Sequence, residues 1–290
     1  MFIVTIIQRS NTMKDFAKVG STQMALLVAG AIIGLIVPVI IAIVWTVKKK
    51  EKFTTVLIGA ATFLLFALIL EKPIQNVLVF PTQMGLPEHA ISRFLSAKPF
   101  LWALVLALFP GVFEETGRLV AFKTVLKNRK NRETSISHGI GHGGVEVMFL
   151  FGLTYITNIS YAIMINTGTF SVVVDQVMTQ APDQIDQLYL VADQLANFPV
   201  SGLLLAIMER IFAVLFHTGA SILVFYACKD KKKFWLYPLA IILHTAMDGV
   251  AALNMAGVIT LSTAALEIFT AVFGLGIFFG AYLGLYRKDA

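Results

Sequence analysis

The sequence predicts an all-α protein, a polytopic bundle of about seven transmembrane helices. Of its 290 residues, 57% are hydrophobic and only 14% are charged, and the mean hydropathy is +0.80. A soluble domain rarely reaches this apolar content, whereas helices that cross a bilayer require it. The basic residues behind the net charge of +6 lie at the ends of apolar runs. They therefore indicate membrane topology and no nucleic-acid partner.

Seven apolar runs are long enough to cross a bilayer, for which a helix needs about 20 residues. The expected spans cover residues 23–47, 53–70, 99–126, 138–165, 201–228, 235–258 and 261–286. The third run contains Pro110 followed by Gly111. Because proline inside a helix removes a backbone hydrogen bond, we expect a kink or break there.

Two of the connecting segments are long. Segment 71–98 is expected to be an ordered loop or a partly re-entrant piece. Segment 166–200 contains four aspartates and neither lysine nor arginine. We expect it to form one or two amphipathic helices outside the bilayer.

Clusters of basic residues predict the orientation. They fall at alternate ends of the seven spans, as KKKEK at 48–52, KTVLKNRKNR at 123–132, KDKKK at 229–233 and RK at 287–288. All four can therefore be cytoplasmic together, as the positive-inside rule requires. This places the N-terminus outside and the C-terminus inside.

The spans group into three regions of a multi-pass protein of the cell membrane, with the lipid bilayer as its surroundings. Residues 1–98 form an N-terminal region with two spans and an ordered extracytoplasmic loop. Residues 99–258 form a core of four spans with the acidic extracytoplasmic insertion at 166–200. Residues 259–290 form the last span and a short cytoplasmic tail.

Ionisable residues recur inside the expected spans, where each is costly to bury and usually functional. Four of the five histidines lie in spans, and only His89 lies in a loop. The set consists of Glu114, Glu115, Arg118, His138, His142, Glu146, Glu209, Arg210, His217, His244 and Asp248.

The spacing of these residues places several of them on common helix faces. His138, His142 and Glu146 recur every four residues and therefore line one face of the fourth span. His244 and Asp248 have the same spacing in the sixth span.

Depth in the bilayer groups residues from different spans. At the helical rise, Glu114, His217 and His244 lie roughly 13 to 18 Å from the nearest cytoplasmic lysine. His142 belongs to a span that enters from the same side and can join them. We expect Glu209 and its neighbour Arg210 to lie deeper and to make structural contacts, each with another span.

The third span offers a base for hydrolysis. Two adjacent carboxylates, Glu114 and Glu115, cannot both ionise cheaply in a low dielectric unless a cation compensates them. Arg118 is that cation, and it lies four residues after Glu114, close enough to pair with it. A glutamate base with nearby imidazoles could activate water and stabilise an oxyanion. The set therefore favours hydrolysis of an amide within or near the membrane.

The same groups could instead hold a divalent metal such as zinc, which would itself supply the hydroxide. His138 and His142 place two imidazoles on one turn, as in helical zinc sites, but the glutamate of the His-Glu-x-x-His motif is missing. His244 and Asp248 are further possible ligands. With a glutamate as the base, no cofactor is required.

The motifs resemble a known family. "FEETGR", the histidine-bearing fourth span, "ERIFAVLFH" and "HTAMD" resemble the YhfC-type membrane peptidases, which are related to the CAAX-processing and bacteriocin-processing (CPBP) intramembrane proteases. The resemblance covers roughly the third to the sixth span. It implies an intramembrane endopeptidase that acts on a membrane-associated protein or peptide. It also implies that Glu114 is the water-activating base, with Glu115 and Arg118 in support.

The resemblance further implies roles for the histidines. His142 or His138 would correspond to the second family motif, and His244 and Asp248 to the third. His217, after the apolar stretch "FAVLF", competes for the second-motif role. The third motif ends here in Asp where the family pattern has Asn or Asp, and family members are classed both as glutamate-type proteases and as metalloproteases.

Two other functional classes stay open. A proton-coupled transporter could use Glu, His and Asp at mid-depth as a relay. Such a protein is expected to have paired broken helices in two halves, whereas this sequence has one Pro-Gly site and no internal repeat. A non-catalytic membrane scaffold would keep the bundle and some histidines without turnover.

Overall fold

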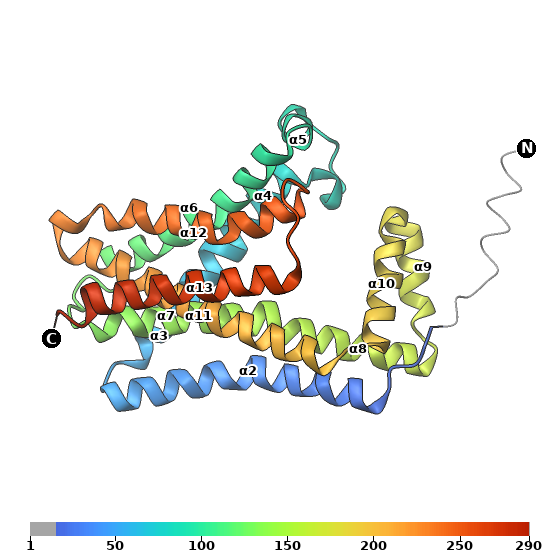
Figure 1. Ribbon diagram of the computed structural model, residues 1–290, viewed down its shortest axis with the longest axis horizontal. Helices are drawn as coiled ribbons and strands as arrows, with labels where there is room; N and C mark the ends of the chain where they lie inside the picture. The colour runs from blue at the N-terminus through green and yellow to red at the C-terminus, as the bar shows by residue number, and fades with distance from the viewer. Residues whose placement is uncertain (1–15, 290) are drawn as a thin grey trace, which may run out of the picture. The chain divides into compact units, whose positions relative to one another are not determined.

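The computed structural model describes residues 16–289, and every regular element within this range is helical (Figure 1). Among these residues, seven helical segments are long and apolar enough to cross a membrane: Ser21–Lys49, Phe53–Val79, Pro99–Lys123, Glu133–Thr167, Val200–Lys229, Lys231–Met255 and Thr263–Tyr286. The predicted all-α class with about seven spans is therefore confirmed. Six of the seven segments agree with the expected spans to within a few residues at each end.

Three of the spans contain a π-helical stretch. The elements are α2 (Ser21–Lys49); α3 (Phe53–Phe63), η2 (Leu64–Glu71) and α4 (Lys72–Val79); α6 (Pro99–Lys123); α7 (Glu133–Glu146), η4 (Val147–Gly152) and α8 (Leu153–Thr167); α11 (Val200–Lys229); η6 (Lys231–Lys233) and α12 (Leu236–Met255); and α13 (Thr263–Ala281) and η7 (Tyr282–Tyr286). The π-helical stretches are η2, η4 and η7. Such wider turns occur frequently near functional sites.

The second span is longer than the sequence predicted. Helix α4 continues it to Val79, so the expected loop is wrong for residues 71–79. The remainder of segment 71–98 contains the 3₁₀ helix η3 (Pro81–Met84) and the short helix α5 (Ala90–Ser96). His89 caps α5, because its Nδ1 accepts a hydrogen bond from the backbone N–H of Ser92.

Helix α6 runs through Pro110 without interruption, so the expected break is wrong. Pro110 has no N–H, which leaves the carbonyl of Leu106 without its partner in the helix. The side chain of Gln75, on α4, donates from Nε2 to this carbonyl at 3.1 Å. A partly buried hydrogen bond from the second span thus replaces the missing one, as an apolar environment requires.

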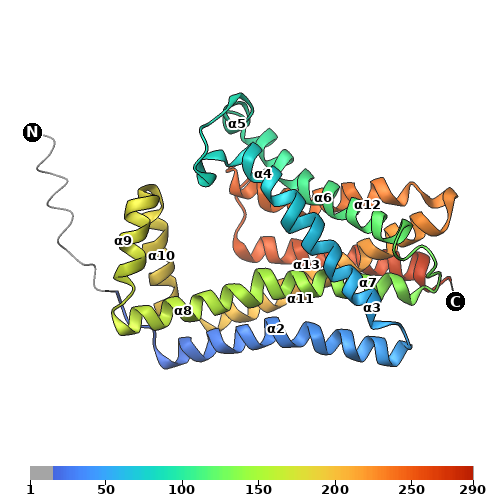
Figure 2. The same cartoon turned by 180° about the vertical axis from the view of Figure 1, so that it is seen from behind.

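The chain divides into two compact units. The first contains the described residues up to 35 together with 150–204, and the second contains 36–149 together with the residues from 205 onward. In the first unit, α9 (Ser171–Gln180) and α10 (Ile185–Ala196) lie side by side in both views (Figures 1 and 2). This pair confirms that the acidic segment forms helices.

In the second unit, α3 packs along α7, and α6 packs along α12 (Figure 2). Glycines make the first contact unusually close. A Cβ atom on Gly59 would lie 2.1 Å from the carbonyl oxygen of His138, and one on Gly141 would lie 1.9 Å from that of Val56. Only glycine permits this approach of two helix backbones.

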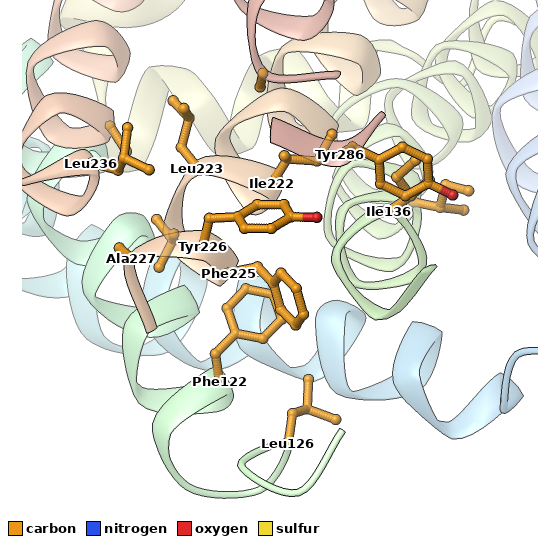
Figure 3. Packing of buried hydrophobic residues seen from close by; sticks show 14 of the residues in the cluster. Phe122, Leu126, Ile136, Ile222, Leu223, Phe225, Tyr226, Ala227, Leu236 and Tyr286 are labelled. Carbon is orange, nitrogen blue, oxygen red and sulfur yellow. The ribbon is translucent and has the colours of Figure 1, made fainter. Parts of the chain in front are cut away.

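The apolar core of the second unit surrounds Phe122 and Phe225 (Figure 3). These two rings meet edge to face with centroids 5.4 Å apart. Phe122 also contacts the ring of His138, at a centroid distance of 4.6 Å. The core therefore adjoins the polar residues of α7 directly.

The orientation and the division into three regions stay predictions. With the acidic segment outside and the basic loops inside, a cysteine at Gln180 should react with an impermeant maleimide on intact cells. A cysteine at Lys231 should react only after permeabilisation. Both are introduced after Cys228 has been replaced with serine, and labelling of both from one side would contradict the seven-span topology.

The contribution to stability of the hydrogen bond from Gln75 to the Leu106 carbonyl can be measured. Gln75→Leu keeps most of the side-chain volume but leaves the carbonyl of Leu106 unpaired, which should cost about 1–3 kcal/mol. Thermal unfolding in detergent should show the loss, whereas the exposed Gln83→Leu serves as the matched control. Equal melting temperatures for the two variants would show that Gln75 does not support the helix.

Candidate active site

Helix α6 brings three ionisable side chains into the interior of the second unit. The residues Glu114, Glu115 and Arg118 are 6%, 0% and 0% exposed. Gly111, one turn earlier, allows α6 to approach α12, because a Cβ atom there would lie 2.9 Å from the carbonyl oxygen of Ile241. The small residue thus places the carboxylates close to the neighbouring span.

The guanidinium of Arg118 has a partner for each of its nitrogens. Nη1 donates to Glu115 Oε1 at 2.6 Å, Nη2 donates to His217 Nδ1 at 2.7 Å, and Nε donates to Ser221 Oγ at 3.2 Å. Nη2 also lies 3.9 Å from Glu114 Oε2. The expected pair with Glu114 exists, but the shorter ion pair is with Glu115. A fully buried arginine requires such complete pairing.

Three imidazoles from three other helices face one oxygen of Glu114. His142 Nε2, from α7, lies 2.8 Å from Glu114 Oε2. His217 Nδ1, from α11, lies at 3.8 Å, and His244 Nε2, from α12, lies at 4.0 Å. The structure therefore brings together the four residues that the depth argument grouped.

His244 is held in a defined orientation. Its Nδ1 lies 2.7 Å from Glu115 Oε1, and because a carboxylate only accepts, Nδ1 carries the proton. In the neutral ring Nε2 then has a free lone pair, which faces Glu114 and, at 3.6 Å, Asp248 Oδ2. The Asp248 side chain is 41% exposed, so this residue lies at the edge of the cluster.

His217 has a contact at each ring nitrogen. Beside the bond from Arg118, its Nε2 lies 2.5 Å from Glu146 Oε2. Glu146 also accepts from Arg210 Nη1 at 3.2 Å, and Arg210 pairs with its neighbour Glu209. Arg210 thus contacts another span, as expected. For Glu209 that expectation is wrong, because its ion pair is with the adjacent residue.

Two polar residues of the cluster are absent from the site predicted from the sequence. The i,i+4 spacing placed Glu146 on the face of His142, but the sequence analysis gave it no role in the site. Ser221 lies one turn after His217 on α11, but serine is common in membrane helices and gives no such signal.

His138 lies one turn from His142 but does not reach Glu114. Its Nε2 lies 3.3 Å from Thr62 Oγ1, and its Nδ1 lies 3.2 Å from Ser221 Oγ. Both partners are hydroxyls. Of the possible metal ligands predicted from the sequence, His138 is therefore the one that the structure places outside the carboxylate cluster.

The residues around Glu114 fit a divalent metal in type and position. One ligand atom from each of Glu114, His217 and His244 lies within 4.8 Å of the others. Carboxylate oxygens and imidazole nitrogens are zinc ligands. The bond from His244 to Glu115 is the kind of carboxylate contact that orients a metal-bound histidine. Arg118, however, already occupies the lone pair of His217 Nδ1.

Comparison with known proteins gives the family. A family model described as YhfC intramembrane metalloprotease matches residues 33–270, which include all the elements of the site. The chain belongs to this YhfC family. It is 32% identical over 231 residues to the uncharacterized membrane protein YhfC of Bacillus subtilis (strain 168), and the alignment covers 79% of this chain and 84% of that protein. No solved structure matches.

Membership of the YhfC family confirms the resemblance found in the sequence motifs. It also agrees with the expected class of enzyme, an intramembrane protease, and with a multi-pass membrane protein. The relation of the family to the CPBP proteases stays a prediction.

Proposed function

We propose that this YhfC-family protein is an intramembrane endopeptidase in which Glu114 activates a water for attack on a peptide bond. The substrate is a membrane-associated protein or peptide. The observation that carries the proposal is the surrounding of Glu114 Oε2 by imidazoles of His142, His217 and His244, with Arg118 within 3.9 Å.

In this proposal the reacting water lies between Glu114 and His244. Glu114 Oε2 and His244 Nε2 are 4.0 Å apart, so one water can contact both at ordinary hydrogen-bond length. The water oxygen attacks the carbonyl carbon while its proton passes to Glu114. When the C–N bond then breaks, the same proton passes from Glu114 to the leaving amine.

The other residues hold these two groups in position. His142 donates from Nε2 to Glu114 and fixes the carboxylate, and Glu115 accepts from His244 and fixes the imidazole. The positive charge of Arg118 compensates the two carboxylates and favours the developing oxyanion, an effect that is strong in a water-poor interior. Asp248 lies at the edge of the cluster, 3.6 Å from His244 Nε2.

A metal-dependent version of the same site is the second candidate. The description of the family and the grouping of the ligand atoms favour it. Glu114, His217 and His244 would hold the ion, and His217 would first have to release Arg118. When bound, a divalent cation such as zinc supplies Lewis acidity and lowers the pKa of water.

Removal of the base tests the proposal. Glu114→Gln keeps the size and hydrogen bonding of the side chain but removes its basicity, so cleavage should fall about 10²–10⁴-fold. The measurement compares new protein termini, by mass spectrometry, in membranes of cells that express the wild type or the variant. The rate is then determined with purified protein and the peptide identified in this way.

Glu209→Gln is the matched control, because Glu209 lies on α11 and pairs with Arg210 rather than with the cluster. It should cleave at the wild-type rate. Wild-type cleavage by folded Glu114→Gln protein contradicts the proposal. If no terminus depends on the wild type at all, the protein is a scaffold or a transporter instead.

Metal removal separates the two versions of the site. With Glu114 as the base, activity should survive treatment with 1,10-phenanthroline, and the purified protein should contain no stoichiometric zinc by mass spectrometry. Loss of cleavage on chelation, with recovery on addition of zinc, would establish the metal-dependent version.

A further inference from the structure

The three histidines around Glu114 differ in what their ring nitrogens contact. His244 has an open Nε2, which lies 4.0 Å from Glu114 and 3.6 Å from Asp248. His142 binds Glu114 through Nε2, and its Nδ1 has no hydrogen-bond partner among the described residues. Of the three, only His217 has a charged side chain within 2.7 Å of each ring nitrogen.

The contact with Arg118 defines the tautomer of His217. A guanidinium N–H can only donate, so Nδ1, at 2.7 Å from Nη2, must be the acceptor and carries no proton. The ring proton is therefore on Nε2. This nitrogen lies 2.5 Å from Glu146 Oε2, a buried oxygen that has no hydrogen bond in the described state, and a carboxylate can only accept.

Both partners of His217 are themselves fixed. Arg118 is fully buried and bound to Glu115 and Ser221. Glu146 is 8% exposed, and its other oxygen accepts from Arg210 at 3.2 Å. His217 is thus held from two sides by groups that have little freedom to move.

We propose that Glu146 is a positioning residue that holds His217 in the Nε2–H tautomer. In this state His217 is the hydrogen-bond acceptor that keeps Arg118 beside Glu114 and Glu115. It offers no free lone pair, so it is neither a proton acceptor in the reaction nor a ligand of any bound metal. His244 alone then presents an open imidazole nitrogen to the reacting water.

Loss of the carboxylate at Glu146 would disturb the whole cluster for a simple reason. In the other tautomer the N–H of His217 Nδ1 would face the N–H of Arg118. Two donors repel each other, so the guanidinium would leave its place between the carboxylates. The consequence for turnover rests on the proposed function, whereas the tautomer itself does not.

The tautomer is measured by nuclear magnetic resonance on ¹⁵N-histidine-labelled protein in lipid nanodiscs. His217→Gln identifies the resonances of this residue. In the wild type, Nε2 should have the shift of a protonated nitrogen and Nδ1 that of an unprotonated one. A wild-type His217 with its proton on Nδ1, or with two protons, overturns the proposal.

Variants of the carboxylate extend the test. Glu146→Leu removes the acceptor and should convert His217 to a mixture of tautomers, whereas Glu146→Gln keeps an acceptor oxygen and should retain the wild-type state. Glu209→Gln changes a carboxylate on the same arginine and should have no effect. An unchanged tautomer in folded Glu146→Leu overturns the role of Glu146. If Glu146→Leu does not fold, Glu146→Gln decides the question. A His217 in Glu146→Gln that no longer holds the Nε2–H tautomer overturns the proposal.

Addition of zinc tests the ligand set without any substrate. The His217 resonances should stay in place at equimolar zinc, whether or not those of His244 shift. A shift of His217 to the position of a metal-bound nitrogen overturns the proposal.

The catalytic consequence is measured on the peptide identified by its new termini. Glu146→Leu should lower kcat about 10–100-fold, the usual cost of removing an outer partner that orients the residues of an active site, and leave KM unchanged. Glu146→Gln should recover most of the rate. The tautomer is measured without substrate, so the two proposals can fail separately. A wild-type protein that holds the Nε2–H tautomer but cleaves no peptide would refute the proposed protease function. It would leave the proposed positioning of His217 by Glu146 intact.

Discussion

The structure of the second unit depends on the burial of Arg118. A guanidinium inside a membrane helix has no water to solvate it, so each of its nitrogens requires a partner from the protein. Glu115 supplies one from the same helix, and His217 and Ser221 supply two from α11. Glu115 in turn holds His244 of α12. One charge therefore fixes how three helices meet, and the polar contacts that stabilise the fold are also those that form the site.

The same arginine bears on the choice between the two versions of the mechanism. The family is described as one of metalloproteases, and the ligand atoms of Glu114, His217 and His244 are close enough to share an ion. In the described state Arg118 supplies the positive charge that a metal would bring, and it occupies the lone pair of His217. Arg118 and a bound metal would therefore compete for one position. The state of His217 reports which of them holds it.

Hydropathy and helical rise made most of the fold predictable, because both depend on residues close in sequence. They gave the spans, the helices of the acidic segment and the common depth of the ionisable residues. The expected break in the third span was wrong because a distant residue intervened. Pro110 does not break α6 because Gln75, thirty-one positions earlier than Leu106, satisfies the carbonyl that proline leaves free. No pattern within the third span indicates that contact.

For the site, the sequence by itself determined which residue types lie at the level of Glu114, and the family motifs named the YhfC family. It did not separate His138 from His142, which lie one turn apart on the same face of α7. Only tertiary structure decided between them, because the packing of α7 against its neighbours sets its rotation about its own axis. That rotation directs His142 to Glu114 and leaves His138 between two hydroxyls. Spacing along a helix fixes which side chains share a face, whereas the partner of each one is set by the helices packed against it.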